Sequence, residues 1–206
     1  MLDAQCSRHS LPWIVRTKIN NPAGFQFVAI TDNYFKLFGL ATDFSIDTDQ
    51  LAEKYRELQR SAHPDRYANA VERDQLLSVQ YAAIINDAYQ ALKWPLSRAV
   101  YMMRLRGVDV DKEHSFDLGP GFLMQQIELR EELESIRQAP DAASALDRMR
   151  HELEQHQASL EKSFARSIVD SSAEGLEQAG QAVNKMQFIV KMQQEVERIE
   201  DELLGL

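Results

Sequence analysis

Pro64 constrains the fold of this chain more than any other residue, because it separates two long stretches of helical sequence. Before it, apolar residues recur three or four positions apart, at Leu51, Tyr55, Leu58 and Ala62. That spacing places them on one face of a helix over residues 48–62. Proline cannot extend a helix and disfavours helical dihedrals in the residue before it. The helix is therefore expected to end at His63, which leaves His63 and Asp65 on an exposed turn.

After the turn the helical pattern resumes over residues 72–93, with apolar residues at Leu77, Tyr81, Ile84, Ile85, Ala88 and Leu92. Two antiparallel helices joined by a loop that carries His-Pro-Asp resemble the J-domain. This module stimulates ATP hydrolysis by heat-shock chaperones of the DnaK type. The resemblance implies a set of chaperone-binding residues on and beside the loop: His63, Pro64, Asp65, Tyr55, Arg56 and Arg66.

Three further segments are similar to the HscB family, the J-type co-chaperones of iron-sulfur cluster biogenesis: residues 33–40, 85–92 and 95–101. A second hallmark of that family is a C-terminal bundle of three helices, and residues 122–134 look like its beginning. The resemblance implies an all-α, L-shaped co-chaperone with two partners. An HscA or DnaK-type chaperone would bind one end, and the cluster scaffold protein IscU the other. The protein would stimulate the chaperone ATPase and deliver the scaffold, which assists maturation of iron-sulfur proteins.

Breaks in the helical pattern predict the domain boundaries. Residues 1–32 show no sustained period and are expected to form an N-terminal extension, poorly ordered or of uncertain role. The J-domain is expected over residues 33–107. Residues 108–121, with Gly119-Pro120-Gly121, are expected to be a solvated linker. Residues 122–206 are expected to form the three-helix bundle that binds the scaffold.

Within these domains the pattern predicts finer features. A short helix at 33–40 should pack through Tyr34, Leu37 and Phe38, and 41–47 should be a polar connection. A fourth helix from Pro95 to about Arg106 should pack on the J-domain. Apolar spacing in the bundle predicts two core seams, at Leu146, Met149, Leu153, Leu160, Phe164 and Ile168, and at Leu176, Ala179, Val183, Met186, Ile189 or Val190, Val196, Ile199 and Leu203.

The first bundle helix is predicted to carry two separate apolar faces. Leu123, Met124 and Ile127 lie three or four positions apart, so they can meet on one side of the helix. Leu129 and Leu133 point toward another side and can fill the bundle core. The first set is therefore free to form an exposed apolar patch. The family resemblance assigns this face to scaffold binding.

Phe188, from the last helix, is expected to complete the patch as an aromatic anchor, with Glu128 and Glu131 as its acidic rim. Leu and Met at such positions also occur in cores, so a core role stays open. A J-protein that presents a different client is the main alternative function. An enzyme that uses the glutamates is disfavoured, because the chain supplies no nucleophile, metal or pocket signature. The protein is thus predicted not to be an enzyme.

The formal net charge of -9 is concentrated in the C-terminal half. Residues 108–206 carry 10 basic and 21 acidic side chains, which gives -11 for that part. An acidic module beside a near-neutral one favours two protein partners and argues against nucleic acid as a ligand.

The single cysteine, Cys6, cannot by itself hold a metal cluster, and His151 and His156 are five positions apart rather than the four of a helical metal pair. We therefore expect no bound metal and no cofactor. No apolar run approaches the roughly 20 residues needed to cross a bilayer. A cytoplasmic location without membrane attachment is the expectation.

Overall fold

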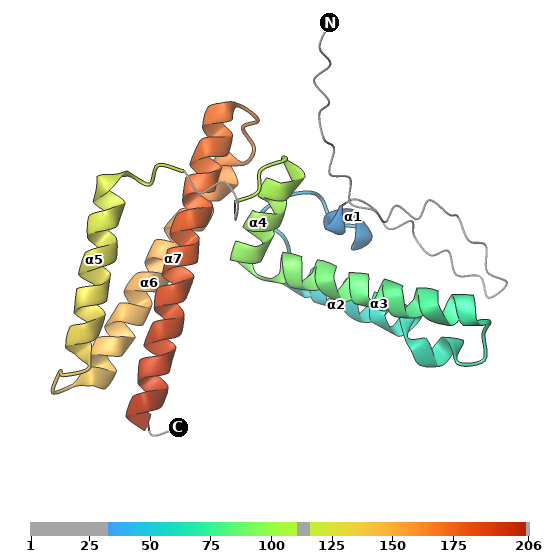
Figure 1. The fold of residues 1–206 in the computed structure, drawn as a ribbon, viewed down its shortest axis with the longest axis horizontal. Helices are drawn as coiled ribbons and strands as arrows, with labels where there is room; N and C mark the ends of the chain where they lie inside the picture. Colours follow the sequence, from blue (N-terminus) through green and yellow to red (C-terminus); the bar gives the residue numbers. More distant parts are fainter. Residues whose placement is uncertain (1–32, 111–115, 205–206) are drawn as a thin grey trace, which may run out of the picture. The chain divides into compact units, whose positions relative to one another are not determined.

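The computed structural model describes residues 33–110 and 116–204, and every regular element in these ranges is a helix (Figure 1). The prediction of an all-α chain is therefore confirmed. The described chain divides into two compact units. The first joins residues 33–42 to Asp49–Tyr89, and the second joins Asp43–Thr48 to the residues from Gln90 onward. The segment 1–32, predicted to be an extension, lies outside the described residues.

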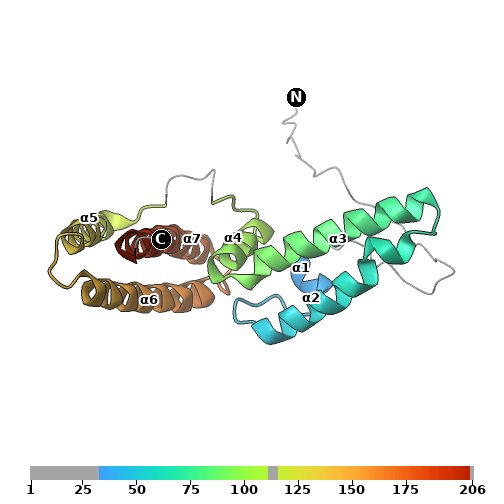
Figure 2. The same ribbon diagram turned by 90° about the horizontal axis from the view of Figure 1, so that it is seen from below.

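The first unit is built on a helical hairpin. Its helices α2 (Thr48–Ala62) and α3 (Glu72–Lys93) lie side by side in both views (Figures 1 and 2). The fully buried side chains of this unit include Phe35, Leu51, Ile85 and Ala88. Leu51 and Ile85 belong to the two apolar faces that the sequence predicted, so the hairpin closes on those faces.

The first helix, α1 (Tyr34–Leu37), is a single turn and is shorter than predicted. The side chain of Asn33 caps it by accepting a hydrogen bond from the amide of Phe35 at 2.9 Å. Leu37 and Phe38 are buried as expected, but the third buried residue is Phe35 rather than Tyr34. Tyr34 is half-buried.

Residues 41–47 were predicted to be a polar connection, yet Phe44 among them is buried. Its ring meets the ring of Phe164 edge to face, with centroids 4.9 Å apart. The guanidinium of Arg98 lies over the Phe44 ring, 5.0 Å from its centroid. Arg98 also donates to the carbonyl of Leu92 at 2.7 Å. One aromatic side chain thus makes this short segment part of the second unit.

Helix α4 (Pro95–Leu105) begins at a proline and ends before Gly107, whose φ of 82° suits glycine. The prediction had this helix pack on the J-domain. In the structure it packs on α7 (Ala173–Leu204), within the second unit. Met102 and Met103 of α4 are both buried, and methionine side chains adapt readily to the surface that they pack on.

The second unit contains the predicted three-helix bundle: α5 (Gly119–Ile136), α6 (Ala142–Ser167) and α7. Side-chain hydrogen bonds cap the N-termini of two of these helices. Asp141 accepts from the amide of Ser144 at 3.2 Å, and Ser172 accepts from the amide of Gly175 at 3.0 Å. The shared core joins buried residues of all three helices: Phe122, Leu129, Leu133, Ile136, Leu146, Met149, Leu153, Phe188, Ile189, Met192, Val196 and Ile199.

The linker prediction is wrong at both of its described ends. Helix α5 begins at Gly119, three residues before the expected start at 122, because a proline in the first helical turn needs no amide partner. Val110 is only 5% exposed. The ring of Phe116 lies so close to Gly180 that a Cβ atom there would come within 2.2 Å of it. Both ends of the segment therefore pack on the second unit rather than remaining solvated.

Three positions of the predicted core seams, Leu160, Leu176 and Leu203, are not fully buried, and one open choice is resolved. Leu203 is 51% exposed, because it lies in the last turn of α7. Ile189 is buried and Val190 is half-buried, which settles the choice between them. Leu160 is also only partly buried against the core.

Candidate interaction surfaces

The tripeptide His63-Pro64-Asp65 lies at the exposed tip of the hairpin, as predicted. Pro64 begins a short 3-10 turn, Pro64–Tyr67, and His63 caps it. The Nδ1 atom of His63 accepts a hydrogen bond from the amide of Asp65 at 3.3 Å. Since Nδ1 acts as the acceptor, the neutral ring carries its proton on Nε2. The side chains of His63 and Asp65 are 58% and 90% exposed, so both present polar atoms to a partner.

Two residues outside the tripeptide hold this turn in place. Tyr67 is buried, and its hydroxyl donates to the carbonyl of Ser61 at 3.4 Å. Gln75 of α3 donates to the carbonyls of Ala68 and Ala70 at 3.1 and 3.0 Å. Neither residue was predicted from the sequence. Tyr67 could have been found as the lone aromatic residue of a polar loop, because such a residue tends to pack. Nothing in the sequence indicates that Gln75 binds the loop.

The predicted chaperone-binding residues of α2 and the turn differ in how far they are exposed. Tyr55 is half-buried and stacks on Tyr89 of α3, with ring centroids 4.1 Å apart. Its hydroxyl donates to Asn86 at 3.4 Å. Arg56 and Arg66 are exposed. Tyr55 is thus a partly packed ring, whereas the two arginines place positive charge at the surface.

The predicted apolar patch on α5 is present. Leu123 and Met124 are each 57% exposed and Ile127 is 49% exposed, although all three are large apolar side chains. Leu129 and Leu133 are buried, as the two-face prediction required. Exposed apolar side chains that cluster on one helix face mark an interaction site more often than isolated ones do.

Glu128 and Glu131 are exposed on the same helix, where the prediction placed the acidic rim. They belong to the turns that follow the patch, so they add negative charge beside an apolar surface. Such charge affects the rate and the specificity of association more than the final affinity.

Phe188 does not complete the patch as predicted. It is 7% exposed and belongs to the bundle core. Its ring meets that of Phe122 nearly perpendicularly, with centroids 5.6 Å apart. The guanidinium of Arg130 lies 5.5 Å from the Phe188 centroid and covers its outer side. Phe188 therefore supports α5 from beneath, and Arg130 is an edge residue that the sequence analysis did not single out.

The described residues contain no group of three or more His, Cys, Asp or Glu side chains placed to hold a metal ion. His151 is exposed, and His156 lies near Gln125, 3.3 Å from its amide nitrogen. Within the described chain, no helix is both long and apolar enough to cross a membrane.

Comparison with known proteins agrees with this architecture. A family model for the HSCB C-terminal oligomerisation domain matches residues 118–197. The co-chaperone protein HscB homolog of Shewanella loihica is 43% identical over 171 residues, which cover 83% of this chain and 99% of that protein. The homolog of Vibrio parahaemolyticus is 45% identical over 174 residues, 84% of this chain and 99% of its own.

Solved structures give the same result. Chaperone HscB from Vibrio cholerae is 43% identical and superposes with a TM-score of 0.73, covering 83% of this chain and 99% of its own. Human co-chaperone protein HscB covers 98% of this chain with a TM-score of 0.76, and at 23% identity it supports the fold alone. The family that the sequence motifs resembled is therefore confirmed, and this chain belongs to the HscB family of co-chaperones.

Proposed function

We propose that this co-chaperone works in iron-sulfur cluster assembly in the cytoplasm, where it stimulates the ATPase of an HscA or DnaK-type chaperone and delivers the scaffold protein IscU to it. The observation that carries the proposal is the placement of His63 and Asp65. Both side chains are largely exposed at the hairpin tip, and neither is needed to fill the core. Polar groups fixed by local hydrogen bonds and facing solvent are suited to recognition by a partner.

The chaperone-binding surface, in this proposal, comprises His63, Pro64, Asp65, Tyr55, Arg56 and Arg66. The two arginines complement an acidic surface, and Asp65 complements a basic group on the partner. Because these charges are exposed, they contribute mainly to orientation and to the association rate. The hydrogen-bonded geometry of the turn contributes the specific contact.

The scaffold-binding surface comprises Leu123, Met124 and Ile127 of α5, flanked by Glu128 and Glu131. Its apolar side chains are exposed in the free protein and would lose water on binding. Phe188 enters the proposal only as support, because its ring is buried beneath the helix. No step of chemistry is assigned to the co-chaperone itself. Its contribution is to bring two partners together.

The decisive experiment measures chaperone ATP turnover with a titration of this protein, in the presence and absence of the scaffold. The parent protein should raise the rate, and His63→Gln should remove the effect while leaving the helical circular dichroism signal unchanged. Arg73→Gln, on the exposed first turn of α3, is the matched control and should stimulate normally. If His63→Gln stimulates as well as the parent does, the proposed chaperone-binding surface is wrong.

A further inference from the structure

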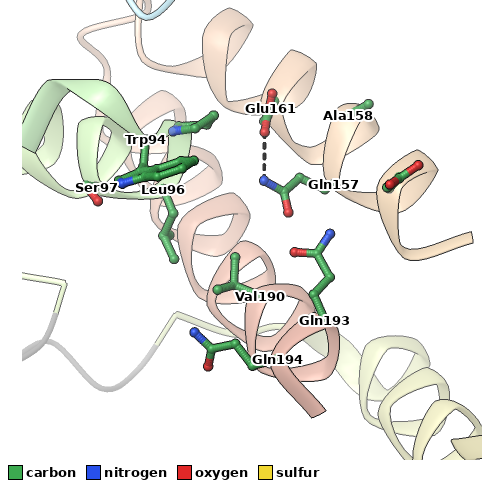
Figure 3. Close-up of a pocket in the computed structure, with 11 residues that line it drawn as sticks. Trp94, Leu96, Ser97, Gln157, Ala158, Glu161, Val190, Gln193 and Gln194 are labelled. Atoms are coloured by element: carbon green, nitrogen blue, oxygen red, sulfur yellow. Dashed lines mark hydrogen bonds between the residues drawn. The ribbon is translucent and has the colours of Figure 1, made fainter. Parts of the chain in front are cut away.

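A groove of about 610 Å³ opens on the second unit, lined by the beginning of α4 and by α6 and α7 (Figure 3). This volume lies within the roughly 300 to 1,000 Å³ range of ligand-binding pockets. Trp94, Leu96 and Val190 give it apolar walls, and side chains of α6 and α7 add carboxylates and amides. No residue of the chaperone-binding or scaffold-binding surfaces lines it, so the groove requires a separate explanation.

Gln157 leaves one polar atom in this groove without a partner. Its Nε2 donates to Glu161 at 2.9 Å, and Figure 3 shows this contact as a dashed line. The contact fixes the orientation of the amide, because the reverse orientation would bring two acceptor oxygens together. The remaining oxygen, Oε1, is buried and accepts no hydrogen bond from any described residue. A buried acceptor of this kind is costly unless a donor is supplied.

The charged groups that line the groove are both acidic: Glu154 and Glu161. The negative charge of Glu161 is partly balanced by the positive charge of Arg98. Burial lowers the pKa of the Arg98 guanidinium, and attraction to Glu161 opposes that shift. Glu154 is 60% exposed, and its paired group is His151, at 3.9 Å. Negative charge is therefore left over on the side of the groove formed by α6.

Trp94 provides an aromatic surface at the α4 end. It is 56% exposed, which is unusual for the largest apolar side chain. The ammonium of Lys93 already lies 4.7 Å from its ring centroid. The indole ring thus lies where a cation can stack, and an exposed indole is the aromatic surface that favours cations most.

We propose that the groove binds an extended segment of a partner protein through an arginine side chain. Arginine fits the three features together: its flat guanidinium stacks on an aromatic ring, its five N–H donors suit carboxylates and an amide oxygen, and its methylene stem suits apolar walls. Glu154, Gln157 and Glu161 follow one face of α6 over about 10 Å. That length matches about three residues of extended chain, so an arginine with one apolar residue on either side would fill the groove.

The test uses the fluorescence of Trp94, isolated by replacing Trp13, the other tryptophan, with phenylalanine in the full chain. The probe is a synthetic five-residue peptide with a central arginine flanked by leucines. Its matched control carries citrulline, which keeps the shape and loses the charge. The arginine peptide should change the fluorescence saturably and bind at least about tenfold more tightly than the citrulline peptide, as expected for a charge-assisted contact. Equal affinities, or no change up to millimolar peptide, would refute the proposal.

Two variants locate the binding. Glu154→Gln combined with Glu161→Gln should weaken the arginine peptide about tenfold or more, and Gln157→Leu should weaken it without altering the charge. Glu174→Gln combined with Glu177→Gln changes the charge equally on an exposed turn of α7 outside the groove and should have no effect. Circular dichroism verifies that each variant is folded. If the acidic double variant binds as the parent does, the arginine contacts another surface and the proposal is wrong.

Two other occupants would also overturn the proposal. If deletion of residues 1–32 alone changes the Trp94 fluorescence, the groove is filled by the chain itself. If the fluorescence changes on dilution together with the sedimentation coefficient, the occupant is a second copy. A partner segment requires that neither treatment has an effect and that the arginine peptide does.

Discussion

The hairpin tip and helix α5 carry the two surfaces that we propose for recognition, and different interactions hold them in place. At the tip, a short turn is fixed by local hydrogen bonds: His63 accepts one, and Tyr67 and Gln75 donate the others. On α5 no local contact is needed, because Leu129 and Leu133 anchor the helix in a core and leave Leu123 outside. A polar recognition site thus depends on hydrogen-bond geometry, whereas an apolar one depends on which helix face the core leaves uncovered.

The largest expected change in stability concerns Phe188. It tests whether this ring is buried beneath α5 or belongs to the exposed apolar patch. Phe188→Ala removes a buried ring and should lower the free energy of unfolding by about 3 to 5 kcal/mol, as for other buried phenylalanines. Leu123→Ala, at an exposed position of the patch, should change it by no more than about 0.5 kcal/mol. Urea denaturation of both variants measures the contrast. Equally small effects would mean that Phe188 lies outward and completes the patch after all.

The next effect concerns the segment that leads into α5. Gly180→Ala would bring a Cβ atom to 2.2 Å from the ring of Phe116, and overpacking of this kind costs about 1 to 3 kcal/mol. Gly121→Ala is the control, because a Cβ atom there meets nothing within 4 Å. In a helix that change should be neutral or stabilise by up to about 1 kcal/mol. Thermal unfolding compares the two, and equal melting temperatures would show that Phe116 does not pack on α7.

A smaller loss of stability is expected when the hydrogen bonds that hold the hairpin tip are removed. Gln75→Ala removes two hydrogen bonds to the loop and should cost about 1 to 2 kcal/mol in stability. It should also accelerate amide exchange over residues 66–71 and reduce ATPase stimulation several-fold. Gln80→Ala, at an exposed position of the same helix, is the control. Unchanged exchange and stimulation in the Gln75 variant would mean that the turn is held by His63 and Tyr67 alone.

The smallest effect is a pH dependence at the start of α6. Hydrogen bonds from Ser144 lower the pKa of the Asp141 carboxyl below its ordinary value. The cap therefore stabilises the fold fully above the ordinary Asp pKa, near 3.9, and loses its effect as the pH falls through the lowered value. Asp141→Asn keeps a capping oxygen but does not titrate, so its melting temperature should fall less between pH 5 and pH 2. Parallel pH profiles for the two proteins would contradict this assignment.

The contrast between the hairpin tip and α5 also explains how much of the fold and of the two surfaces could be predicted from the sequence. The limits of α2 and α3 follow from Pro64 and from local apolar spacing, so they agree with the structure. The exposed face of α5 also follows from spacing within one helix. Phe188 was misplaced because the middle of α7 is apolar on several sides, and only packing of α5 and α6 decides which residues are covered. Phe44 and Phe116 were missed for a related reason, since an isolated aromatic residue in a connection has no period to reveal its partner.

The central claim is that the two surfaces act independently, and one paired titration tests it. Chaperone ATP turnover and scaffold binding are measured for the parent, for His63→Gln, and for Leu123→Ala combined with Met124→Ala. His63→Gln should lose the stimulation and keep scaffold affinity. The double variant should lose several kcal/mol of scaffold binding, since buried anchors cost roughly 1 to 4 kcal/mol each, and keep the stimulation measured without scaffold. Loss of both activities in either folded variant, or of neither in both, would contradict the account.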